Sequence, residues 1–298
     1  MNPPPWLWAV FTIIAAAAQT LRNAMQRELT GTIGTLGATH VRFLFGFPFA
    51  LVFLAGVTLW TGAPLPHPPW TFWLWVFVGS AAQIAATALM LAAMGERSFV
   101  VTIAYIKTEP IQVAIFGLLF LGDAVTLPMM IAIVVATSGV VIMSTKPGGM
   151  VGGIKPTLLG LASGGMFALS AIGYRGGILN LGLANFIMSA TFTLAVGLIV
   201  TTAMLSAFLV VRAPSVMPAI MRVWKRSLFA GFMGAFASQF WFLAFALATA
   251  ASVRTLALVE VLFAQLVARF AFGQRTTPRE AIGMVLVVVG VVLLILAY

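Results

Sequence analysis

Charged residues are scarce in this sequence, and cysteine is absent. Charged side chains make up 7% of the 298 residues and hydrophobic ones 62%, whereas soluble domains carry roughly 25% charged residues. The absence of cysteine excludes disulfides, thiolate metal sites and thiol nucleophiles. Two isolated histidines and six acidic residues cannot supply the Ser–His pair, paired aspartates or His-rich cluster of a membrane-embedded enzyme. We therefore expect no enzyme, no cofactor and no metal site.

Apolar segments long enough to cross a bilayer fill almost the whole chain. A bilayer core about 30 Å thick needs roughly 20 apolar residues in each spanning helix. The sequence predicts an all-α integral membrane protein with about ten transmembrane helices, multi-pass in a cell membrane and most simply the bacterial inner membrane. The predicted spans lie near 6–24, 37–60, 70–94, 99–121, 127–144, 157–175, 184–211, 227–248, 250–272 and 280–298.

Basic residues are scattered between the apolar segments and do not gather on one face, so the net charge of +10 predicts membrane orientation and no nucleic-acid partner. Lys and Arg near helix ends stay in the cytoplasm. Only Arg175 lies clearly on the opposite side, so the count places both termini outside the cytoplasm. Twelve of the sixteen Lys and Arg lie on connections after odd-numbered spans or at the edges of these spans: Arg22, Arg27, Arg97, Lys146, Lys155, Arg212, Arg222, Lys225, Arg226, Arg269, Arg275 and Arg279.

The two halves of the chain resemble each other. "EPIQVAIFGLLFLGD" (109–123) aligns without gaps on "EVLFAQLVARFAFGQ" (260–274), and the following spans carry Gly139 and Gly290 in register. Five helices in each half is an odd number, so homologous halves insert in opposite senses, as in carriers that alternate access around a midplane site. We predict two inverted five-helix repeats, 1–148 and 149–298, around a central cavity.

These features resemble the drug/metabolite transporter superfamily, in particular its ten-helix branch with two EamA-type repeats. The resemblance rests on the ten short-looped spans, on Arg42 in "HVRFLFGFPFA", and on "TEPIQVAIFGLLFLGD", where Pro110 and Gly122 match the family pattern. It covers essentially the whole chain and implies a carrier of small metabolites, with export favoured over uptake.

The sequence departs from the family pattern in several places. Asp123 stands where Glu is usual, Gln274 replaces the acid of the second copy, and Val261 replaces its Pro. Family members of this length commonly keep both termini in the cytoplasm, opposite to the Lys/Arg count, so the orientation stays open. The first span has no Glu, so the proton-exchange mechanism of small multidrug relatives does not transfer.

Charged residues in the middle of two predicted spans are the leading site candidates. Lys107 and Glu109 are followed at once by Pro110, which removes a backbone hydrogen bond and kinks a helix. Glu260 is the equivalent of Glu109, and Arg254 precedes it by nearly two turns. Ionisable groups inside a membrane mark transport pathways or pair with one another. The two acids therefore either face a cavity, where they bind a cation or exchange a proton, or pair with the two basic residues across helices.

The first span ends in a polar stripe that contains Gln19, Arg22 and Asn23, and His40 with Arg42 opens the second span. If the two helices pack side by side, these groups form a basic, hydrogen-bonding vestibule, in which His40 can titrate near neutral pH. The alternative is that they mark the wet end of a helix with its cytoplasmic anchor.

Amides and aromatic rings complete the predicted substrate site. Gln83 and Gln239 lie deep in comparable spans, Trp241 is next to Gln239, and Tyr105 precedes Lys107. Such groups suit a small amphipathic or cationic metabolite. A Gln between helices also often bonds only its neighbour, and Trp241 can face lipid.

We therefore expect a secondary active transporter of a small organic metabolite, an amino acid or related compound, working by alternating access. The expected partners are the substrate, the lipid bilayer, and protons or another coupling ion. Uptake or exchange of a cationic or zwitterionic nutrient is the alternative, and a channel is a weaker one. The sequence contains no P-loop, so we expect no coupling to ATP within this chain.

Overall fold

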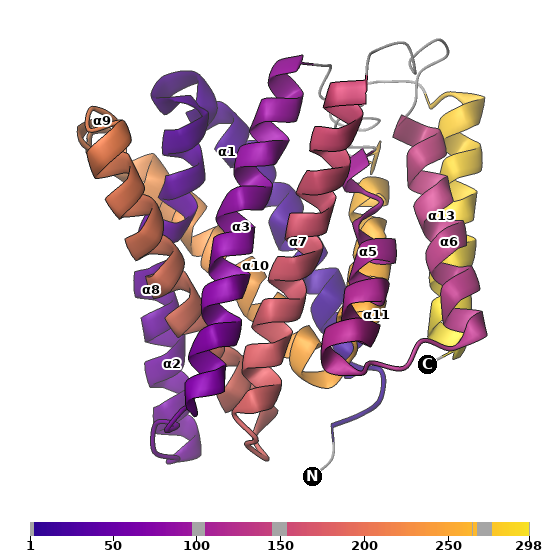
Figure 1. Ribbon diagram of the computed structural model, residues 1–298, viewed down its shortest axis with the longest axis horizontal. Coiled ribbons are helices and arrows are strands. Elements are labelled where there is room, and N and C mark those ends of the chain that lie inside the picture. The colour runs from indigo at the N-terminus through magenta and orange to yellow at the C-terminus, as the bar shows by residue number, and fades with distance from the viewer. Residues whose placement is uncertain (1–2, 97–104, 145–153, 264, 267–275, 298) are drawn as a thin grey trace. The chain divides into compact units, whose positions relative to one another are not determined.

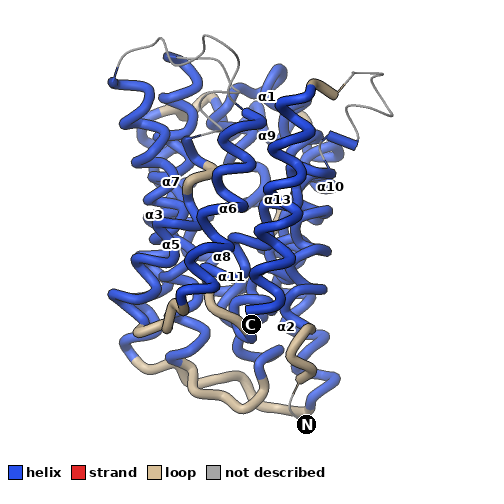
Figure 2. Tube along the Cα trace, turned by 90° about the vertical axis from the view of Figure 1, so that its right-hand side faces the viewer, coloured by secondary structure: helices blue, strands red, loops and turns tan. Residues whose placement is uncertain are grey.

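The computed structural model describes residues 3–96, 105–144, 154–263, 265–266 and 276–297, and every regular element in these ranges is a helix (Figures 1 and 2). Their bounds are α1 Leu7–Leu44, α2 Phe47–Thr61, α3 Trp70–Glu96, α5 Glu109–Phe116, the π-helical η1 Gly117–Leu121, α6 Leu127–Ser144, α7 Ile154–Asn180, α8 Phe186–Arg212, α9 Val216–Arg222, α10 Trp224–Leu247, α11 Ala250–Leu256, the 3₁₀ turn η2 Ala257–Val259, and α13 Pro278–Ala297.

Six of the described helical stretches are long and apolar enough to cross a membrane, and three shorter ones are apolar over 10–17 residues. The all-α, multi-pass class predicted from the sequence is therefore confirmed. Parts of the predicted spans 99–121 and 250–272 lie outside the described residues, so the count of ten stays a prediction. The six long stretches are Leu29–Thr61, Trp70–Met90, Thr157–Asn180, Phe186–Arg212, Trp224–Leu247 and Pro278–Ala297.

α1 contains the first predicted connection. Gly34 has φ 70° and ψ 173° inside the helix range, a backbone conformation that glycine adopts without the steric penalty of a Cβ atom. This residue separates a first helix from a second one that continues towards α2. The predicted spans 6–24 and 37–60 fall on either side of it.

The chain divides into two compact units, each built from both halves of the sequence. Unit 1 comprises residues 1–84 and 173–247, and unit 2 comprises residues 85–172 and 248–298. The chain passes between them inside α3, inside α7, and between α10 and α11. The predicted boundary at 148 separates two homologous sequence repeats, and such repeats need not coincide with compact units. This boundary stays a prediction.

Close helix contacts at small residues hold unit 1 together. In the contact between α3 and α7, a Cβ atom added to Gly173 would lie 2.6 Å from the backbone of Gly79. α1 packs along α10 (Figure 1), where a Cβ on Gly231 would lie 2.4 Å from that of Phe45. Small residues let helices approach closely in membranes, where no hydrophobic force drives them together.

Unit 2 uses the same device between α6 and α13, which lie side by side (Figure 1). A Cβ on Gly139 would lie 2.6 Å from the carbonyl oxygen of Gly283, and one on Gly290 would lie 2.5 Å from the backbone nitrogen of Ala136. Gly139 and Gly290 are the two glycines in register in the sequence repeat. Their equivalent positions therefore serve the same contact.

Candidate functional site

Two helices of unit 2, α5 and α11, carry the charged residues singled out in the sequence. Residues 107–108 form a turn and α5 begins at Glu109, because Pro110 has no N–H and suits the first turn of a helix. Thr108 Oγ1 donates a hydrogen bond to the carbonyl oxygen of Tyr105 at 2.7 Å. A new helix thus starts at Glu109, after a turn at residues 107–108, where the sequence predicted a kink.

An equivalent interruption precedes Glu260. α11 starts at an N-cap, where Thr249 Oγ1 accepts a hydrogen bond from Ser252 N at 3.2 Å. It ends at Leu256, and the 3₁₀ turn η2 intervenes before Glu260. Both glutamates of the sequence repeat therefore follow a break in regular α-helix. Non-helical backbone at membrane depth occurs where it is buried in protein or lines a cavity.

Four charges form two ion pairs between these segments. The Lys107 ammonium pairs with the Glu260 carboxylate, and Arg254 Nε lies 3.1 Å from Glu109 Oε1. The side chains of the four residues are 13–20% exposed, so both pairs are largely withdrawn from solvent. Each pair joins a cation of one segment to the acid of the other. We call Lys107, Glu109, Arg254 and Glu260 the charge quartet.

Local helix electrostatics favour the Arg254–Glu109 pair. Glu109 lies in the first turn of α5 and Arg254 in the last turn of α11, where helix dipoles favour an acid and a base respectively. Glu109 Oε1 and Arg254 Nε are buried, and neither makes a hydrogen bond. These two atoms therefore attract each other as charges without the alignment of a hydrogen bond.

The sequence left two roles open for these acids, and the structure shows the pairing. That the charge quartet also opens onto a substrate cavity stays a prediction.

Tyr105 packs against α7, since a Cβ on Gly160 would lie 2.7 Å from the Tyr105 Cβ. Sequence reasoning missed Gln112, one turn after Glu109, whose Nε2 donates to the carbonyl oxygen of Leu161 at 3.3 Å.

The candidates in unit 1 form neutral hydrogen bonds between helices. Trp241 Nε1 donates to Gln19 Oε1 at 3.2 Å, linking α10 to α1. Gln239 Nε2 donates to Thr191 Oγ1 at 2.7 Å, linking α10 to α8. Trp241 is 5% exposed, so it packs inside unit 1 and does not face lipid. These contacts explain why polar side chains occur inside the apolar helices. Their role in substrate binding stays a prediction.

His40 is fully buried. Its Nε2 atom lies 2.9 Å from Ser206 Oγ. Its Nδ1 is buried without a hydrogen bond. Gln83 is half-buried on α3. Asn23 lies in α1, but its side chain is outside the described residues.

Sequence reasoning missed a hydroxyl cluster in unit 1. The Tyr174 hydroxyl lies 3.3 Å from Ser80 Oγ and 3.2 Å from Thr201 Oγ1, which brings α7, α3 and α8 together. The adjacent Arg175, 8% exposed, donates from a guanidinium nitrogen to the carbonyl oxygen of Phe245 at 2.5 Å. The only sequence signal was a Tyr-Arg pair inside an apolar span, and Arg175 had been interpreted as an orientation marker.

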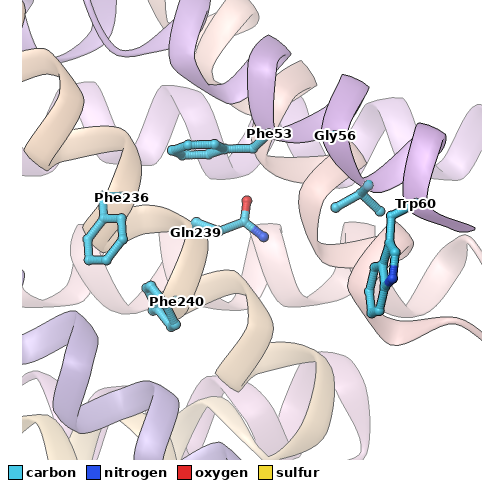
Figure 3. Close-up of a pocket in the computed structure, with 7 residues that line it drawn as sticks. Phe53, Gly56, Trp60, Phe236, Gln239 and Phe240 are labelled. Atoms are coloured by element: carbon cyan, nitrogen blue, oxygen red, sulfur yellow. The ribbon is translucent and has the colours of Figure 1, made fainter.

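A groove of about 350 Å³ lies between α2 and α10 in unit 1 (Figure 3). Gln239 is the one polar side chain in its lining, and its Oε1 is buried without a hydrogen bond. The groove therefore offers aromatic contact with little polar recognition. Its lining residues are Phe53, Gly56, Val57, Trp60, Phe236, Gln239 and Phe240.

Spanning helices with paired charges inside an apolar bundle define a multi-pass membrane protein whose polar chemistry is internal. Residues 6–145 match the EamA-like transporter family. The resemblance to the drug/metabolite transporter superfamily is thereby confirmed. The second EamA-type repeat stays a prediction.

One solved structure, described only as "Crystal structure of protein", has the same fold. Its TM-score is 0.76 at 15% sequence identity, and the match covers 97% of this chain and 96% of that chain. At this identity the likeness shows the fold alone. A search of curated proteins found no match.

Proposed function

We propose that this protein is a secondary active transporter of a small organic zwitterion, an amino acid or related compound, which it carries by alternating access. The EamA-like family is one of transporters. The observation that supports the finer proposal is the charge quartet, with two cations and two acids crossed between α5 and α11. In this proposal the charge quartet binds the substrate, and the protein moves the substrate without changing it chemically.

Charge balance favours a zwitterion as substrate. The quartet sums to zero, and an uncompensated charge at membrane depth is costly, about 2.5 to 3.5 kcal/mol on insertion scales. A molecule with one carboxylate and one ammonium group can enter between Arg254 and Glu109 and satisfy both. A lone anion or cation leaves one acid or one base without a counter-charge.

In this proposal the Arg254–Glu109 pair opens to admit the substrate. The Lys107–Glu260 pair then holds the same segments together while substrate occupies the other pair. Protons or another coupling ion supply the driving force in this proposal.

Export across the bacterial inner membrane is the proposed direction, and it rests on the family resemblance. Uptake or exchange of a cationic or zwitterionic nutrient is the alternative. For a zwitterion, the same quartet also accepts the substrate from outside. A channel fits less well, because crossed charges close a continuous pore.

Transport by purified protein in liposomes tests the proposal. Labelled amino acids are offered with and without an imposed pH gradient, and we expect substrate-dependent flux that falls at least about tenfold in Glu109→Gln, consistent with loss of one buried charge contact. Glu280→Gln is the matched control, since Glu280 lies at the start of α13 and caps Thr277 N at 2.7 Å. Unchanged flux in a folded Glu109→Gln variant would show that the quartet is not part of the transport site.

A further inference from the structure

A basic segment joins the spanning helices α8 and α10 in unit 1. Arg212 ends α8, Arg222 ends α9, and Lys225 with Arg226 opens α10. All four side chains are exposed. The sequence contains no Asp or Glu between Asp123 and Glu260. We call residues 212–226 the basic connector.

The basic connector is fixed to the body of unit 1. Ile220 of α9 is fully buried in a cluster with Leu29 and Ile33 of α1, and Met217 and Val223 pack against this cluster. The cations are therefore displayed from an ordered surface. Because α8 and α10 are both long enough to span, the segment that joins them lies at one surface of the bilayer.

Large apolar side chains are exposed beside the cations. Met221 is 56% exposed and Trp224 47%, and Lys225 Nζ lies 5.9 Å from the centre of the Trp224 ring. Tryptophan favours the headgroup level of a bilayer, and Lys or Arg beside it attracts anionic lipid. A soluble phosphate or a nucleic acid would use the cations but leave these apolar surfaces in water.

We propose that the basic connector binds anionic phospholipid, with the lipid phosphate held by Arg222 and Lys225 and the start of its acyl chains lying against Met221 and Trp224. Arg212 and Arg226 add to the local positive potential. The surface thus selects one lipid class, independently of the substrate carried by the charge quartet.

Lipid selectivity in bilayers of defined composition tests this site. The full chain is reconstituted in phosphatidylcholine nanodiscs that contain a minor fraction of phosphatidylglycerol, and the relative association of spin-labelled forms of the two lipids is measured. Each cation near the surface changes binding by about fivefold. Replacing Arg222 and Lys225 with Gln should therefore lower the preference for phosphatidylglycerol by about tenfold or more.

Two further variants separate charge from folding. The exchange of Arg222→Lys with Lys225→Arg keeps the charge and should keep the preference. Lys155→Gln removes an exposed cation of unit 2 and should leave the preference unchanged. An unaltered preference in the double Gln variant, or an equal loss in Lys155→Gln, overturns the proposal.

Competition distinguishes a lipid from a soluble anion. Millimolar inorganic phosphate should not displace the spin-labelled phosphatidylglycerol, and Trp224→Ala should weaken its association with all cations in place. Full displacement by phosphate, or no effect of Trp224→Ala, would show a general anion surface and refute a lipid site.

Discussion

Units 1 and 2 differ in the balance and the pairing of their charged residues. Unit 2 places two cations and two acids in one crossed quartet. Unit 1 contains one acidic residue, Glu28, against eight basic ones, namely Arg22, Arg27, Arg42, Arg175, Arg212, Arg222, Lys225 and Arg226. Among its described contacts, α1, α8 and α10 are joined by neutral hydrogen bonds, such as Gln239 to Thr191. The comparison indicates that unit 2 pairs opposite charges with each other, whereas the described polar contacts of unit 1 are hydrogen bonds.

The largest effect is expected where a buried charge loses its partner. Glu260→Gln leaves the Lys107 ammonium uncompensated, and we expect a loss of about 3 kcal/mol in the free energy of unfolding. Lys107→Met combined with Glu260→Gln should recover most of it, because a neutral pair needs no compensation. Unfolding in a titration of sodium dodecyl sulfate against mild detergent measures both. Simply additive losses would mean that the two residues do not interact.

A smaller effect is expected at Arg175, which is a buried arginine of unit 1. Arg175 donates to the carbonyl oxygen of Phe245, and hydrogen bonds that involve a charged group contribute about 1.5 to 3 kcal/mol. Arg175→Met should therefore destabilise the protein by about 2 kcal/mol in the same titration. A loss below about 0.5 kcal/mol would contradict a stabilising role for this hydrogen bond, given the usual contribution of a charged donor.

The smallest effect is expected at the neutral contact between α8 and α10. Hydrogen bonds between membrane helices average about 0.6 kcal/mol, so Gln239→Leu should cost about that much. A double-mutant cycle with Thr191→Val should give a coupling energy of the same size. Coupling above about 2 kcal/mol would place this contact with the charged ones and weaken the contrast between the units.

Much of the fold followed from local patterns. Apolar segment lengths predicted the membrane class and the connections between spans, and Pro110 predicted an interruption within its span. Gly34 ends the first helix within the expected connection, and Pro110 begins α5 after a break. The register of Gly139 and Gly290 also anticipated a shared role, because close helix packing depends on residue size.

Side-chain partners were beyond local reasoning. Sequence could identify Glu109 and Glu260 as costly residues in apolar spans, and it offered pairing across helices as one of two roles. It could not show that the pairing occurs. For Trp241, a substrate-site candidate, sequence left exposure to lipid open as the alternative; it is buried, because helix rotation is set by packing. The cluster of Tyr174, Ser80 and Thr201 was missed, because each residue is an isolated hydroxyl in its own span.

The sequence alone determined that this is a helical membrane protein and which residues carry unusual chemistry, because the cost of burying polar and charged groups depends on residue type and segment length. Only the tertiary structure decided how those groups are satisfied. That outcome depends on which helices approach and how each is rotated, and small residues far apart in the chain control both.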